Sequence, residues 1–236
     1  MFDRSELKER AREQLGNNLF GKNWTTAVLA CLVYGLLIGA IQMITGAGTI
    51  VSILIGGPLL YGLARLFLWQ AVNKEPMEIG DLFKGFTDDF SGTLLLNLMQ
   101  TVFVCLWSLL FVIPGIVKSY SYSMAFFIKA DHPEYDWRKC LEESKRLTSG
   151  HKMDLFVLDL SFIGWSIIGM LCLGIGSLWV MAYRYATLAQ CYKVLQADKF
   201  VNTDEIRFTD DAERNEEEEY QTERMGDRTI KKNYEE

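Results

Sequence analysis

The sequence holds few of the residues that build disulfide or metal sites. Its 236 residues include five cysteines and two histidines. The cysteine count is odd and no two cysteines have the C-x-x-C spacing, so neither a disulfide framework nor a zinc site is expected. His132 and His151 fit no H-E-x-x-H pattern. We therefore expect no metal and no other cofactor.

Signatures of soluble enzymes are also missing. The chain has no Gly-rich phosphate loop followed by Lys-Ser/Thr, no G-x-S-x-G and no polar cluster of carboxylates. We therefore expect a protein that is not an enzyme and that binds no nucleic acid.

Long stretches of the chain almost lack charge, although charged residues make up 23% of it. The charges crowd into residues 1–23, 70–92, 129–154 and 193–236. A soluble domain mixes charged and apolar residues, because its whole surface must be wetted. The separation therefore indicates an integral membrane protein.

Six segments between the charges are candidates to cross a bilayer, which takes about 20 apolar residues. They are residues 24–44, 50–72, 93–113, 114–130, 155–173 and 177–195. The segment 114–130 is the weakest, because it is short and contains Lys118 and three serines. Glycine and proline near the junctions predict tight, uncharged connections within three helical hairpins.

The basic residues predict the orientation. Of 24 Lys and Arg residues, 21 lie in the four charged segments, and the connections within the hairpins hold none. Basic residues stay on the cytoplasmic side during insertion. We therefore expect both the N-terminus and the C-terminus in the cytoplasm.

Each hairpin follows an amphipathic segment. Apolar residues recur at helical spacing within residues 3–15, 79–90 and 137–147. Two interpretations stay open: these helices lie along the cytoplasmic interface, or they pack onto the ends of the bundle. The expected fold is all-α, a polytopic membrane helical bundle of six transmembrane helices arranged as three hairpins, each preceded by an amphipathic interfacial helix.

Three regions follow from this pattern. Residues 1–23 form a cytoplasmic amphipathic helix, residues 24–197 a six-helix transmembrane domain, and residues 198–236 an acidic tail. From residue 203 onward the tail holds 13 acidic against 6 basic residues. Such a segment buries too little apolar surface to fold, so we expect it to be disordered and cytoplasmic.

Four charged residues fall within predicted spans, and they form a candidate intramembrane charge cluster of Arg65, Lys118, Asp159 and Arg184. A charge near the bilayer centre costs about 2.5–3.5 kcal/mol on insertion scales, so it usually faces a partner or water. We predict that Asp159 pairs with Arg184 or Arg65. Lys118 lies near enough to the outer surface for its ammonium group to reach the headgroups. The cluster is either an ion pair that fixes the hairpins, or a site for an anionic substrate, a lipid headgroup or a proton relay.

Several stretches resemble the bacterial DUF975 family. They are IPGIVKSYSYSMA at residues 113–125, EESKRL at 142–147, GHK at 150–152 and LFVLDLSFIGW at 155–165. The N-terminal ELK and REQL motifs fit as well. The family consists of uncharacterised integral membrane proteins, mostly of Gram-positive bacteria, and is distantly similar to the membrane domain of some glycerophosphodiester phosphodiesterases. The resemblance implies a multi-pass protein of the bacterial cytoplasmic (plasma) membrane and brings no catalytic residues.

Two functional hypotheses follow. The first is a non-enzymatic scaffold, accessory or lipid-interacting membrane module. The alternative is a small transporter or channel for an anionic solute that uses Arg65, Asp159 and Arg184. The expected partner is the lipid bilayer, with anionic lipid headgroups or another membrane protein as further candidates.

Overall fold

A computed structural model describes residues 4–16, 21–43, 48–171 and 176–199. These residues are mostly helical, and none of them lies in a strand. Residues 1–193 form one compact unit, and residues 194–236 form a second, of which only 194–199 are described, as helix. The predicted tail at 198–236 therefore lies almost wholly outside the described residues.

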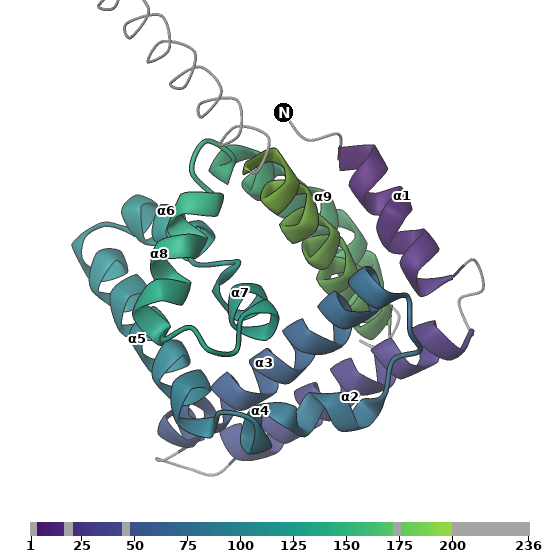
Figure 1. Ribbon diagram of the computed structural model, residues 1–236, viewed down its shortest axis with the longest axis horizontal. Helices are drawn as coiled ribbons and strands as arrows, with labels where there is room; N and C mark the ends of the chain where they lie inside the picture. The colour runs from purple at the N-terminus through teal and green to yellow at the C-terminus, as the bar shows by residue number, and fades with distance from the viewer. Residues whose placement is uncertain (1–3, 17–20, 44–47, 172–175, 200–236) are drawn as a thin grey trace, which may run out of the picture. The chain divides into compact units, whose positions relative to one another are not determined.

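Within the described residues, four helices are long and apolar enough to cross a membrane. They are α2 (Lys22–Gln42), α3 (Gly48–Asn73), α5 (Phe90–Leu110) and α9 (Lys152–Leu171) (Figure 1). Each begins and ends within three residues of a span predicted above. Residues 176–199 are helical too, but this helix is not among the candidate spans. The helices thus indicate an all-helical membrane protein, whereas six spans arranged as three hairpins are not confirmed.

The prediction of one spanning helix over 114–130 was wrong. Helix α6 (Val112–Ser121) ends after ten residues, and α7 (Ala125–Asp131) begins after a short turn. The serines of this stretch bond to nearby backbone, as when the Ser123 hydroxyl donates to the Tyr120 carbonyl at 2.8 Å. Such local bonds compete with the helical pattern and favour a break.

Helix α8 (Trp137–Leu147) satisfies the backbone at this break. The Ser144 hydroxyl donates to the Ser121 carbonyl at 2.9 Å and accepts from the Met124 amide at 3.2 Å. The Thr148 hydroxyl also reaches the Ser121 carbonyl, at 3.3 Å. Buried backbone groups need such partners, so the break is possible only where protein surrounds it.

Helix α3 lies at the centre of the first unit, in contact with α2, α5 and α7. It also contacts two short helices, η1 (Ile79–Phe83) and α4 (Lys84–Thr87), which replace the single amphipathic helix predicted over 79–90. A Cβ atom on Gly62 would collide with the Leu82 backbone. Only glycine allows this close approach between α3 and η1.

The apolar faces of two predicted amphipathic helices lie against protein. In α1 (Arg4–Leu15), Leu7, Ala11 and Leu15 are at most 3% exposed. In α8, the residues that face inward are Cys140, Leu141, Ser144 and Leu147. Of the two interpretations above, the structure favours packing onto the bundle for these helices.

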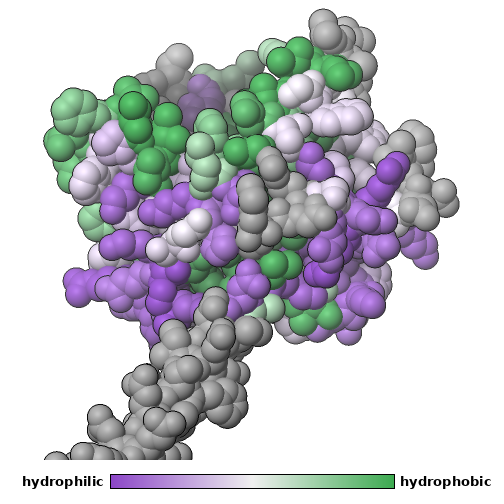
Figure 2. Space-filling view, turned by 90° about the horizontal axis from the view of Figure 1, so that it is seen from above, coloured by the Kyte–Doolittle hydropathy of each residue, from purple (hydrophilic) through white to green (hydrophobic). Residues whose placement is uncertain are grey.

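The molecular surface is divided by polarity. Figure 2 shows hydrophobic side chains gathered on one side and hydrophilic ones on the other. Many exposed apolar residues lie toward the ends of α2 and α9 and around the junction of α5 with α6. They include Leu36, Leu37, Leu109, Leu110, Phe111, Val112, Ile113, Ile167, Ile168 and Met170. Exposed apolar side chains gathered in this way suit contact with lipid.

Candidate functional site

Asp159 and Arg184 form a bidentate ion pair between α9 and the helix over 176–199. The guanidinium Nε and Nη2 donate to Oδ1 and Oδ2 of Asp159 at 2.7 and 3.0 Å. The Tyr120 hydroxyl of α6 donates to the same carboxylate at 3.2 Å. One carboxylate thus joins three helices, in the fork geometry that suits arginine.

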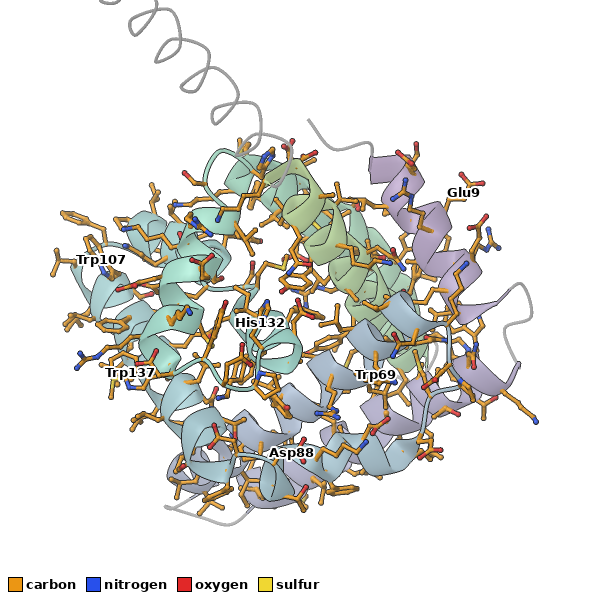
Figure 3. The ribbon with its side chains drawn as sticks, viewed as in Figure 1. Glu9, Trp69, Asp88, Trp107, His132 and Trp137 are labelled. Atoms are coloured by element: carbon orange, nitrogen blue, oxygen red, sulfur yellow. The ribbon has the colours of Figure 1, made fainter. Side chains whose placement is uncertain are left out.

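Arg65 and Lys118 have other neighbours. Arg65 donates to Asp88 Oδ2 at 2.9 Å, and its guanidinium lies 5.7 Å from the ring centre of Trp69 (Figure 3). The Lys118 ammonium lies 4.9 Å from the ring centre of Trp107, which projects from α5 (Figure 3). The charges of Lys145 and Lys152 also act on Lys118, so Lys118 near the outer surface and residues 129–154 in the cytoplasm cannot both hold. Of the four predicted residues, the structure therefore brings together Asp159 and Arg184, and it gives Arg65 a different carboxylate.

A buried lysine was missed by the sequence reasoning. The Lys129 side chain is 3% exposed, and its ammonium group contacts Asp89 Oδ2 at 2.7 Å and the carbonyls of Pro133 and Tyr135 at 2.7 and 2.8 Å. An ammonium group has three donors, so all are used. Partial burial acts to raise the pKa of Asp89, but hydrogen bonds from Lys129 and the Gly92 amide outweigh it and hold that pKa below its usual value. This arrangement ties α7 to the start of α5.

A groove of about 400 Å³ lies between α1, the start of α2, α9 and the helix over 176–199. We call it the tryptophan groove. Its lining consists of Lys8, Arg12, Trp24, Trp165, Trp179, Val180 and Tyr183. The volume is typical of sites that hold small organic molecules. Because its tryptophans come from three separate helices, sequence spacing gave no sign of it.

Hydrogen bonds fix part of the groove wall. Trp24 is 5% exposed, and its indole Nε1 donates to the Gly16 carbonyl at 2.8 Å. The Tyr183 hydroxyl donates to the Lys8 carbonyl at 3.0 Å, which attaches α1 to the opposite wall. Trp165, in contrast, is 61% exposed. The groove therefore has one wall that hydrogen bonds hold in place and an exposed aromatic edge.

The groove changes from apolar to charged at α1. Lys8 and Arg12 are one turn apart, so their side chains share a face of the helix. The Lys8 ammonium lies 4.9 Å from the ring centre of Phe162. A second cavity of about 590 Å³ shares Lys8, Arg12 and Tyr183 with the groove and adds Ser5, Glu9 and Glu13. A ligand with an apolar body and a phosphate end would match this gradient.

Comparisons with known proteins bear on the family alone. No curated protein and no solved structure matches the chain. The expected similarity to the membrane domain of glycerophosphodiester phosphodiesterases stays a prediction. A family model described as "Protein of unknown function (DUF975)" matches residues 1–118 and 109–199, which together cover most of the chain. The chain therefore belongs to the DUF975 family.

Proposed function

We propose that this chain is a non-enzymatic membrane module that holds a phospholipid in the tryptophan groove. The observation that carries the proposal is the joining of an aromatic wall to two cations in one groove. Tryptophan and basic side chains are the residues that anchor proteins at the level of lipid headgroups. An acyl chain would lie against Trp165 and Trp179, and the phosphate would lie near Lys8 and Arg12.

The setting of the groove supports this proposal. Two of its residues, Trp24 and Trp165, lie on α2 and α9, which are apolar enough to cross a bilayer, and Trp165 is exposed, so lipid beside α9 would reach it from the side. If the basic segments are cytoplasmic, as their distribution predicts, α1 places the phosphate end at the cytoplasmic leaflet of the plasma membrane. No transferred proton or nucleophile is needed for such a role, in line with the expectation of a protein without enzymatic activity.

The alternative of anion transport has less support. It requires Arg65, Asp159 and Arg184 to offer surplus positive charge in one place. Asp159 and Arg184 neutralise each other at 2.7 Å, and Arg65 lies 2.9 Å from Asp88. Pairs of this kind suit a role in joining helices, since each cation already has a carboxylate.

Fluorescence quenching tests the proposal. The purified full-length chain is reconstituted in vesicles of phosphatidylcholine with brominated acyl chains, because bromine quenches indoles that it touches. We expect Trp165→Phe and Trp179→Phe to remove a large share of the quenchable signal. Trp137→Phe is the matched control, since Trp137 lies on α8 and is not part of the groove.

A second variant tests occupancy. Val180→Trp fills the groove and should lower the amount of phospholipid that stays bound through detergent purification, as counted by native mass spectrometry. Val102→Trp is its control, because Val102 is 47% exposed on α5. Equal lipid retention by both variants, with unchanged melting temperatures, would refute the proposed function.

A further inference from the structure

Three lysines lie near the place where α6 meets α8 and α9. The Ser121 carbonyl, at the end of α6, accepts hydrogen bonds from Ser144 and Thr148, which are both fully buried. Lys118 lies one turn before this point on α6, and Lys145 lies next to Ser144 on α8. Lys152, the first residue of α9, follows Thr148 by four residues. We call Lys118, Lys145 and Lys152 the lysine cluster.

The cluster is electrostatically unbalanced. Burial lowers the pKa of Lys118, and the positive charges of Lys145 and Lys152 lower it further. Among the ion pairs of the described residues, none involves any of the three lysines. Of the four carboxylates on α8 and α9, Glu143 pairs with Arg146, Asp159 pairs with Arg184, and Asp154 lies 3.5 Å from His151. The fourth, Glu142, is exposed. An anion placed between the lysines would relieve their repulsion.

The surroundings place the cluster at a boundary between apolar and polar surface. Lys118 emerges from the same short helix as Val112, Ile113 and Ile116, which are 70%, 75% and 45% exposed. Its ammonium lies 4.9 Å from the ring centre of Trp107, itself 39% exposed. A lysine and a tryptophan beside exposed apolar side chains are typical of the level at which lipid headgroups lie.

We propose that the lysine cluster binds the phosphate of an anionic lipid headgroup. The site lies on the α6 side of α9 and shares no residue with the tryptophan groove, so it goes beyond the proposed function and does not depend on it. Three cations that make no ion pair among the described residues favour a headgroup with net negative charge over a zwitterionic one. A soluble phosphate carries the same chemistry, so the test separates the two sources.

The test measures the enrichment of phosphatidylglycerol over phosphatidylcholine around the full-length chain. The chain is extracted from vesicles that hold equal amounts of the two lipids, and bound lipids are counted by native mass spectrometry. We expect Lys145→Gln, Lys152→Gln and Lys118→Gln each to lower this enrichment about fivefold. The matched control Lys139→Gln, on the same helix as Lys145, should leave it unchanged.

Two further comparisons identify whether the phosphate belongs to a lipid or to a soluble ion, and check that the variants are folded. Enrichment that survives added inorganic phosphate at constant ionic strength identifies a lipid ligand, and enrichment displaced by it identifies a soluble phosphate at the same lysines. Lys145→Arg should retain the enrichment that Lys145→Gln loses, although both should melt like the wild type. Enrichment that is equal in the wild type and all three glutamine variants would overturn the proposal. Val180→Trp should leave the enrichment unchanged, which separates this site from the groove.

Discussion

Replacing the buried Lys129 by methionine should destabilise the first unit strongly. The change removes three charge-assisted hydrogen bonds, to Asp89 and to the carbonyls of Pro133 and Tyr135. Breaking a buried ion pair costs roughly 3–5 kcal/mol, because the remaining partner stays unpaired. Asp89 is 32% exposed and can regain water, so the low end applies, about 3 kcal/mol.

A loss of this much unfolding free energy is large enough to measure as a shift in melting temperature. For chains of this size about 1 kcal/mol corresponds to about 2–4 °C, so Lys129→Met should melt about 6–12 °C below the wild type. The assay follows intrinsic fluorescence of the protein in detergent during heating. Lys139→Met, on the exposed face of α8, is the control and should shift the midpoint by no more than about 2 °C.

The pairing itself is tested by a double-mutant cycle with Asp89→Asn. If the ammonium and the carboxylate stabilise each other, the double variant should be less destabilised than the sum of the single ones. A Lys129→Met protein that melts with the Lys139→Met control would refute the reasoning, because it would mean that the ammonium contributes nothing net.

Three further predictions rest on individual contacts. Gly62→Val should lower the yield of folded protein in size-exclusion chromatography, because the valine side chain would collide with the Leu82 backbone. Gly39→Val is the control and should leave the yield unchanged, because no described atom lies within 4 Å of the added Cβ. Asp159→Asn should lower the melting temperature by an amount equivalent to about 1–3 kcal/mol, since Arg184 loses a charged acceptor, and an unchanged midpoint would argue against a stabilising pair. Because the folded-state pKa of Asp89 is lowered, its stabilisation is complete above the unfolded value near 3.9 and is lost as pH falls through the folded value. The midpoint of the wild type should therefore fall more steeply below about pH 4 than that of Asp89→Asn, and parallel curves would contradict this assignment.

The long helices could be predicted from sequence because their signal is local. A run such as residues 24–44 is apolar at nearly every position, and the helix α2 (Lys22–Gln42) matches it closely. The failure at 114–130 has a physical reason too. Apolar content alone gave no sign that α8 would supply hydroxyl groups to a break after Ser121.

The candidate sites depended on tertiary contacts that spacing does not encode. Asp159 and Arg184 were considered together because both lie within apolar segments, where a charge is conspicuous. Asp88 and Lys129 lie in charged segments, so nothing in the sequence distinguished them from solvated residues. The tryptophan groove needs α1 to lie against α9 and the helix over 176–199, and no periodicity predicts that contact.

The short α6 has a consequence for the shape of the surrounding bilayer. Its ten residues rise about 15 Å, which is about half of a hydrocarbon core about 30 Å thick. The helix ends against α8, whose outer face is charged and stays in water. If the headgroups meet the protein at Lys118, the junction at Phe111 lies seven residues away, about 10 Å, and so stays within one leaflet unless α6 meets the membrane higher than Lys118. Helix α5, which ends at this junction, would then cross the bilayer only in part. This part of the protein would then take up area in one leaflet and not in the other. Such a wedge curves a bilayer so that the expanded leaflet lies on the convex side.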